Sequence, residues 1–134
     1  MRIGVDLGGT NIRAALCSEG NIINQQNHEL VHKESLEETL EQLKTLLHAV
    51  FHPEIKGIGI GVPSVVDIQH GIVYNVTNIP SWKRVELKDY LEKEFQVPVY
   101  INNDVNCFAL GEYHYGMARG YDPVVGLAIG TGLG

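Results

Sequence analysis

Two short glycine-rich segments of this sequence have the residue types that bind phosphate. The first follows an apolar run that ends near Asp6, and it consists of Gly8, Gly9, Thr10 and Asn11. Glycine permits positive φ and lets another group approach the main chain closely, so successive N–H groups can point at an anion. A carboxylate at the mouth of such a turn could share a divalent cation with a phosphate. The pattern indicates a phosphate-binding turn with Asp6 as a metal ligand, although paired glycines also close ordinary hairpins.

The second segment lies at the end of the sequence. Gly130, Thr131 and Gly132 follow an apolar run over 124–129 and repeat the combination of glycines with one threonine hydroxyl. Two such turns could hold a polyphosphate from two sides. The sequence has no Walker-type lysine loop.

A run of three amide or acid side chains, Asn102, Asn103 and Asp104, comes directly after an apolar segment. A carboxylate at a strand-to-helix junction can take a proton from a hydroxyl that attacks phosphorus, which contributes about 10² to 10⁴ in rate. Alternatively, Asn103 or Asp104 caps the helix that follows, which is worth about 0.5–2 kcal/mol. The spacing alone leaves both readings open.

The histidines and cysteines indicate less. His48 and His52 are four residues apart near the end of an expected helix, but no third ligand has suitable spacing, so we expect no metal there. Cys17 and Cys107 are too few and too far apart for a disulfide framework, which favours a reduced, cytoplasmic setting. We expect Cys107 to be a small buried hydrophobic residue.

The elements that position these residues start with an antiparallel meander. Strands over 3–7 and 12–16 flank the first glycine turn, and a third, polar strand runs from 22 to about 31. Ser35 and Glu38 form the pattern of a capping box, with Glu38 reaching back to the N-cap. The helix that follows has leucines at helical spacing on one face and ends before Pro53.

Alternating strands and helices fill the rest of the chain. We expect a strand over 56–62 whose alternate glycines allow close packing on one face, a hairpin of 65–67 with 71–74, and a polar loop over 75–82. The remaining elements are a helix over 86–95, a strand over 98–101, a helix to about 115 and a strand over 124–129. This order predicts an α/β domain with a mixed sheet, in which ligands bind beyond the carboxyl ends of the strands.

Composition excludes several classes of function. The 134 residues include 10 basic and 16 acidic side chains, for a net charge of -6. Binding to nucleic acid or to an anionic membrane surface is therefore disfavoured, because both need a basic face. No apolar run approaches the length of a membrane span. Met1 and Arg2 lead directly into the first expected strand, so we also expect no signal peptide.

Four motifs in the same order resemble the ROK family of repressors, open reading frames and kinases. They are Gly4–Arg13, Gly59–Pro63, Asn103–Glu112 and Gly130–Gly134. Within the family, the chain looks most similar to the bacterial kinases that phosphorylate glucose. The resemblance implies the actin-like ATPase fold, with a ribonuclease-H-like lobe over 1–120. Residues 121–134 would then be the first strand and phosphate turn of a C-terminal lobe.

The resemblance also implies roles for single residues in the transfer of phosphate from Mg-ATP to a hexose. Asp104 matches the base that deprotonates the sugar 6-hydroxyl, and Asn103 matches a ligand of a sugar hydroxyl. Asp6 matches the carboxylate near Mg²⁺. The other matches are Gly8, Gly9, Thr10 and Asn11 in the first phosphate turn, Gly130, Thr131 and Gly132 in the second, and Ser64, Val65, Thr77 and Asn78 on the sugar side.

The chain departs from the family pattern after Gly134. Family members continue into an adenine pocket, a glutamate-glycine-histidine sugar segment and a cysteine-rich Zn²⁺ site. We therefore expect an N-terminal part that is inactive alone, zinc only in the missing part, and a homodimer at full length. Since Met1 is only five residues ahead of Asp6, we expect no DNA-binding segment of the kind that family repressors carry there. A sugar-sensing regulator and a sugar-independent ATPase remain as alternative functions.

Overall fold

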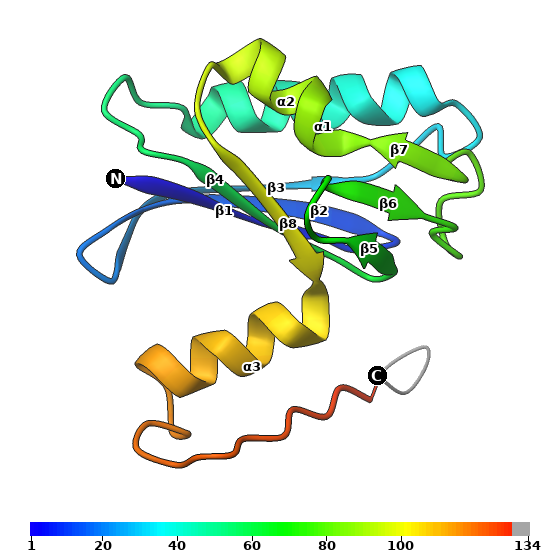
Figure 1. Ribbon diagram of the computed structural model, residues 1–134. Helices are drawn as coiled ribbons and strands as arrows, with labels where there is room; N and C mark the ends of the chain where they lie inside the picture. Colours follow the sequence, from blue (N-terminus) through cyan, green and yellow to red (C-terminus); the bar gives the residue numbers. More distant parts are fainter. Residues whose placement is uncertain (130–134) are drawn as a thin grey trace.

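The computed structural model describes residues 1–129, which form two sheets and three helices (Figure 1). The elements in chain order are β1 (Arg2–Leu7), β2 (Asn11–Ser18), β3 (Asn21–Glu29), α1 (Leu36–Val50), β4 (Ile58–Val62), β5 (Val65–Asp67), β6 (Ile72–Tyr74), β7 (Arg84–Glu86), α2 (Leu87–Phe95), β8 (Val99–Asn103) and α3 (Asp104–Tyr115). Of the residues described, no helix is both long and apolar enough to cross a bilayer.

The larger sheet is mixed, as the sequence predicts. Its strands lie in the order β3-β2-β1-β4-β8. β1, β2 and β3 pair antiparallel through tight turns, whereas β4 pairs parallel with both β1 and β8. The carboxyl ends of β1, β4 and β8 therefore meet at one edge of the sheet. This edge carries the ends of the motifs around Asp6, Val62 and Asn103.

Helices α1 and α2 lie on one side of this sheet, and α3 lies on the other (Figure 1). The core is between the sheet and the first two helices, where alternate residues of the strands and one face of α1 and α2 are buried. Leu43, Leu46 and Leu47 of α1 have no exposed surface. This packing follows from the helical spacing of the leucines in the sequence.

Only half of the capping box at the start of α1 forms. The N–H of Glu38 donates to Ser35 Oγ at 3.3 Å, so Ser35 is the N-cap as predicted. The expectation for the Glu38 side chain is wrong. Its Oε2 lies 3.2 Å from His32 Nδ1, while the N–H of Ser35 donates to the carbonyl oxygen of His32 at 2.9 Å. The Glu38 carboxylate therefore pairs with the imidazole of His32, whereas a complete capping box would pair it with the N–H of Ser35.

The alternate glycines of the segment 56–62 have different surroundings. A Cβ on Gly61 would lie 3.3 Å from the Cα of Asp104 and 3.5 Å from the Sγ of Cys107, so α3 packs closely there. A Cβ on Gly59 would meet no atom within 4 Å. The expected close packing along the whole strand is therefore wrong at Gly59 and right at Gly61, because α3 reaches only the end of β4.

A small antiparallel sheet of β5, β6 and β7 follows β4. The hairpin of β5 and β6 is confirmed at the expected positions. β7 was not expected, because a strand of three residues directly before a helix has too few residues to show alternation. It takes Glu86 out of the expected helix, and α2 begins at Leu87.

The expected strand over 124–129 is wrong for most of its length. Residues 124–128 have no ladder, and only Ile129 makes an isolated bridge. The segment runs along α3 (Figure 1), and a Cβ on Gly126 would lie 3.0 Å from the Cβ of Ala109. An extended segment becomes a strand only beside another strand that pairs with its backbone groups, and its neighbour here is a helix.

Candidate functional site

The first glycine turn joins β1 to β2. The N–H of Gly8 donates to the carbonyl oxygen of Asn11 at 2.9 Å, and a Cβ on Gly8 would lie 3.0 Å from that same oxygen. Neither Gly8 nor Gly9 has positive φ, since the glycines with positive φ in the described chain are Gly20, Gly71 and Gly120. The expectation based on φ is therefore wrong, and glycine is required here by close approach alone.

Asp6 lies at the end of β1, on the exposed face of the sheet. Its carboxylate Oδ2 is 3.9 Å from Arg13 Nη1, and both side chains are more than half exposed. A surface pair of this kind is worth only about 0–1 kcal/mol, so the carboxylate can change partner. No group of three His, Cys, Asp or Glu side chains within residues 1–129 is arranged to hold a metal. A lone carboxylate fits Mg²⁺, which keeps several waters and binds protein through one or two carboxylates plus phosphate oxygens.

Asn103 fixes the start of α3. Its Oδ1 accepts from the N–H groups of Val105 at 3.0 Å and Asn106 at 3.3 Å, which makes it the N-cap. Its Nδ2 donates to the carbonyl oxygens of Val62 at 3.5 Å and Ser64 at 3.3 Å. One side chain thus ties the helix to the end of β4 and to the loop that follows.

Two further amides support this turn. Asn102 Oδ1 accepts from the N–H of Asn103 at 2.8 Å and from Asn106 Nδ2 at 3.1 Å. Neither Asn102 nor Asn106 is among the site residues predicted from the sequence. No simple periodicity could have paired them, because Asn102 belongs to β8 and Asn106 to α3.

Asp104 is the first residue of α3 and is half-buried. Its Oδ1 accepts from the N–H of Val105 at 2.9 Å, and within residues 1–129 no group donates a hydrogen bond to Oδ2. The cap and the free carboxylate oxygen are thus on different residues. Asn103 satisfies the helix terminus, so Asp104 is not required for that purpose.

Cys107 is one turn further along α3, close to both carboxylates. Burial raises the pKa of its thiol, and the negative charges of Asp104 and Asp6 raise it further. The side chain is half-buried rather than buried as expected, and a raised pKa disfavours the thiolate that a nucleophile needs.

The two loops expected on the sugar side both reach this edge. Ser64 Oγ donates to the carbonyl oxygen of Tyr74, and Val65 beside it is 72% exposed. Thr77 and Asn78 are exposed on the loop between β6 and β7. Asn103 Nδ2 reaches the carbonyl oxygen of Ser64, Asn78 lies against Gly9, and Asp6 pairs with Gly61, which lies against Asp104. The structure therefore brings together Asp6, the first glycine turn, Ser64, Asn78, Asn103 and Asp104. Gly130, Thr131 and Gly132 lie outside the described residues.

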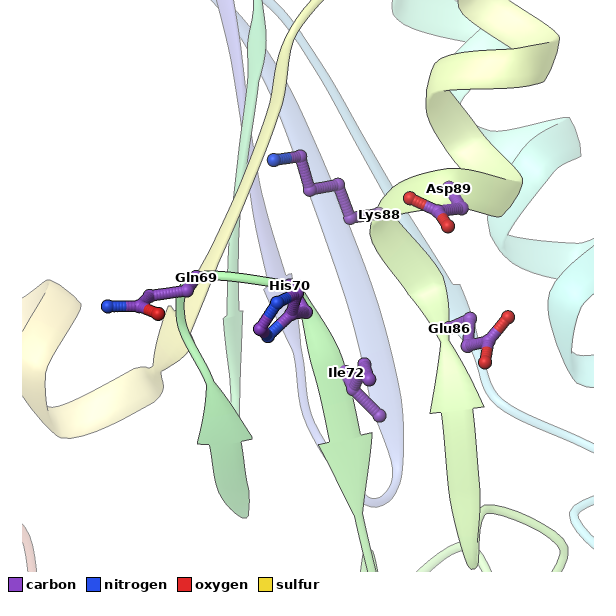
Figure 2. A pocket seen from close by; sticks show the side chains of 6 residues that line it. All are labelled: Gln69, His70, Ile72, Glu86, Lys88 and Asp89. Atoms are coloured by element: carbon purple, nitrogen blue, oxygen red, sulfur yellow. The ribbon is translucent and has the colours of Figure 1, made fainter.

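Other features lie away from this edge. Figure 2 shows a pocket of about 320 Å³ between the β5–β6 turn and the start of α2, lined by Gln69, His70, Ile72, Glu86, Lys88 and Asp89. It contains none of the residues expected to bind sugar or phosphate. His48 Nε2 of α1 lies 3.0 Å from Glu94 Oε1 of α2. His52, which follows α1, accepts a hydrogen bond at Nδ1 from the N–H of Glu54. Each histidine thus has a partner within the chain.

The sheet order, the βα units that follow the meander and the polar edge define a lobe of the actin-like ATPase class. Its structural neighbours include sugar kinases of that fold. The sequence model of the ROK family matches residues 2–134, and the chain belongs to the ROK family.

Relatives of this chain include kinases and regulators. It is 38% identical over 134 residues to a glucokinase of Thermotoga maritima, a match that covers 98% of this chain and 42% of the relative. It is 34% identical to a xylose repressor of Bacillus spizizenii, covering 98% of this chain and 35% of the repressor. The chain spans less than half the length of these relatives.

Among solved structures, a ROK family glucokinase from Streptomyces griseus in complex with glucose and AMPPNP superimposes with a TM-score of 0.88. The sequence identity is 32%, and the match covers 99% of this chain and 42% of the other.

Proposed function

We propose that this chain is the N-terminal lobe of an ATP-dependent sugar kinase that phosphorylates the 6-hydroxyl of a hexose, with glucose as the expected substrate. The observation that carries the proposal is the position of Asp104. Its carboxylate has one oxygen without a donor in the described chain, and it lies at the same sheet edge as the glycine turn after Asp6. Glucokinase relatives at 38% identity support the same assignment.

The proposed reaction uses each group in one role. The sugar 6-oxygen attacks the γ-phosphorus of ATP, the bond to the β-phosphate oxygen breaks, and Asp104 Oδ2 receives the hydroxyl proton. Phosphoryl transfer needs positioning and charge neutralisation more than covalent help from the protein. The N–H groups of Gly9 and Thr10 would bind phosphate oxygens, while Gly8, whose own N–H donates to the carbonyl oxygen of Asn11, would keep the turn closed beside them. Mg²⁺, held by Asp6 and phosphate, would supply positive charge at the transferring group.

The other ligand contacts are part of the same proposal. Asn103, Ser64, Val65, Thr77 and Asn78 would line the sugar side, and Gly130, Thr131 and Gly132 would bind phosphates from the second side. The nucleoside site would come from residues outside this chain, which spans 42% of its glucokinase relative. We therefore expect the 134-residue chain alone to have negligible kinase activity. At full length we expect a cytoplasmic homodimer, with any structural Zn²⁺ outside this chain.

The test is Asp104→Asn in the full-length product of the gene that encodes this chain. Asparagine keeps the shape of the side chain but cannot accept the proton, so kcat should fall by about 10² to 10⁴ with an unchanged circular dichroism spectrum. Asp89→Asn, an exposed acid in the first turn of α2, is the matched control and should keep full activity. A kcat close to that of the wild type in Asp104→Asn would overturn the assignment.

The xylose repressor relatives support a second candidate, a non-catalytic sugar-sensing regulator. It predicts sugar binding without phosphorylation in the full-length protein. A sugar-independent ATPase instead predicts ATP hydrolysis at the same rate with and without sugar. A coupled assay over a panel of hexoses, pentoses and N-acetylhexosamines separates the three functions.

A further inference from the structure

The loop between β6 and β7 is held firmly at its base. Val76, Ile79 and Trp82 recur every three residues and are buried, so one side of the loop belongs to the core. Trp82 Nε1 donates to Thr39 Oγ1 of α1 at 2.7 Å, and Ser81 Oγ donates to the carbonyl oxygen of Lys33 at 2.7 Å. A loop packed by its own side chains in this way behaves as a fixed wall.

Backbone hydrogen bonds close the same loop on itself. The N–H of Val76 donates to the carbonyl oxygen of Trp82 at 3.0 Å, and that of Ile79 donates to Val76 at 3.0 Å. These bonds present the intervening Thr77 and Asn78 outward, where both are exposed. The position of Asn78 is therefore fixed by residues that lie before and after it.

Asn78 lies directly on the first glycine turn. A Cβ on Gly9 would lie 2.7 Å from Asn78 Nδ2 and 2.8 Å from its Cγ, closer than side-chain atoms approach. The absence of a side chain at Gly9 is what allows this contact. In the described chain the Asn78 amide makes no hydrogen bond of its own, so its contact with the turn is one of packing. A change in the turn must displace Asn78, and the reverse also holds.

We propose that Asn78 couples the two ligand sites, so that a nucleotide on the glycine turn strengthens sugar binding and sugar strengthens nucleotide binding. The inference rests on the proposed function. A phosphate bound by the turn would order Gly9, and Gly9 would in turn hold Asn78 in one conformation. The loop backbone is fixed in either case, but the sugar then meets an Asn78 side chain that is already held in one rotamer, which lowers the entropy lost on binding. Such coupling is reciprocal and is typically about 5-fold to 150-fold.

The experiment measures glucose affinity calorimetrically in the full-length protein, with and without saturating Mg-AMPPNP. For the wild type we expect AMPPNP to tighten glucose binding by about 5-fold or more. For Asn78→Ala we expect a ratio below about 2-fold, because the contact with Gly9 is lost. Lys83→Ala, an exposed position just after the same loop, is the control and should keep the wild-type ratio.

The ratio of glucose affinities with and without Mg-AMPPNP distinguishes a coupling role of Asn78 from a simple contact with the sugar. If Asn78 only binds sugar, Asn78→Ala weakens glucose binding equally in both conditions and leaves the ratio unchanged, which overturns the inference. A wild-type ratio near 1 overturns it as well. In both cases the kinase assignment stands. If the wild type binds neither glucose nor AMPPNP, the proposed function itself fails and the coupling role fails with it.

A second pair of variants tests the contact directly. Gly9→Ala places a methyl group against Asn78, so it should lower the thermal midpoint of unfolding. Adding Asn78→Gly removes the obstructing side chain and should recover most of that loss, since residues in contact are not additive. Full additivity of the two changes would show that the contact does not exist in solution, and the inference would be wrong.

Discussion

The chain up to Ile101 and the chain from Asp104 onward differ sharply in how they are stabilised. All the fully buried apolar side chains of the described residues lie at or before Ile101. From 104 to 129 no residue is buried, and Phe108, Leu110, Tyr113, Tyr115, Met117, Tyr121, Val125, Leu127 and Ile129 are exposed. α3 is therefore held mainly at its first turn, by the hydrogen bonds of Asn102 and Asn103. The proposed base lies at the end that is held.

The largest expected difference between the two regions is in the effect of removing a leucine. Leu46→Ala in α1 empties a fully buried position and should lower the free energy of unfolding by about 2–5 kcal/mol. Leu110→Ala in α3 removes a side chain that is 51% exposed and should change it by less than about 0.5 kcal/mol. Urea denaturation of this chain measures both. Equal effects would mean that α3 is packed in solution and that the comparison is wrong.

A buried hydroxyl sharpens the same comparison. Thr39 is the one buried polar side chain in the described residues, and it accepts from Trp82 Nε1. Thr39→Val keeps the shape of the side chain but leaves the indole N–H unsatisfied, which should cost about 1–3 kcal/mol. Thr45→Val, at an exposed position of the same helix, is the control and should be close to neutral. The measurement is again the denaturation midpoint.

The two helix caps should differ in the range of their effect. Ser35→Ala removes the cap of α1 and should lower the global free energy of unfolding by about 0.5–2 kcal/mol. Asn103→Ala removes the cap of α3, and we expect faster amide hydrogen exchange in α3 with a smaller global change. Slower exchange across β4 and β8 than across α3 in the wild type would support this. A global loss as large as that of Ser35→Ala would contradict it.

The smallest expected effect concerns a surface pair in the chain up to Ile101, Asp67 with His70. The imidazole of His70 donates to Asp67 at 2.8 Å, and this bond, followed by the backbone N–H of His70, lowers the pKa of the Asp67 carboxyl. A carboxyl whose pKa is lowered by folding stabilises the folded state above its unfolded pKa of about 3.9. That contribution is lost as the pH falls through the lowered value. In an NMR titration, His70→Ala should raise the Asp67 pKa. No change would mean that the pair does not form in solution.

Local patterns predicted most of the first region. The meander, α1, the β5–β6 hairpin and β8 follow from turn residues and apolar spacing within a few residues of each other. β7 was not predicted because three residues are too few to show alternation, and the course of 124–129 was not predicted because it depends on contact with α3. The partner of Glu38 is His32, six residues earlier, and the capping-box pattern does not include that position. The outcome at 124–129 is instructive, since an apolar run indicates extended backbone but not which element lies beside it.

For the candidate site, the sequence predicted the residue types but not their contacts. The motifs around Asp6, Asn103 and Asp104 lie at one sheet edge, as expected from the carboxyl ends of parallel strands. The spacing could not tell whether Asn103 or Asp104 caps the helix. In the structure Asn103 is the N-cap of α3, and Asp104 keeps one carboxylate oxygen without a donor in the described residues. The contact of Asn78 with Gly9 joins residues almost 70 positions apart in the numbering, and no local pattern encodes it.

Gly61 determines how closely Asp104, the proposed base, can approach β4. Any other residue at this position would bring a carbon to 3.3 Å from the Cα of Asp104, so β4 and the first turn of α3 would have to separate by a few tenths of an ångström. A shift of a few tenths of an ångström there would change the height at which a hydroxyl meets the carboxylate. Substitutions at Gly61 therefore change the position of the Asp104 carboxylate without changing its chemistry.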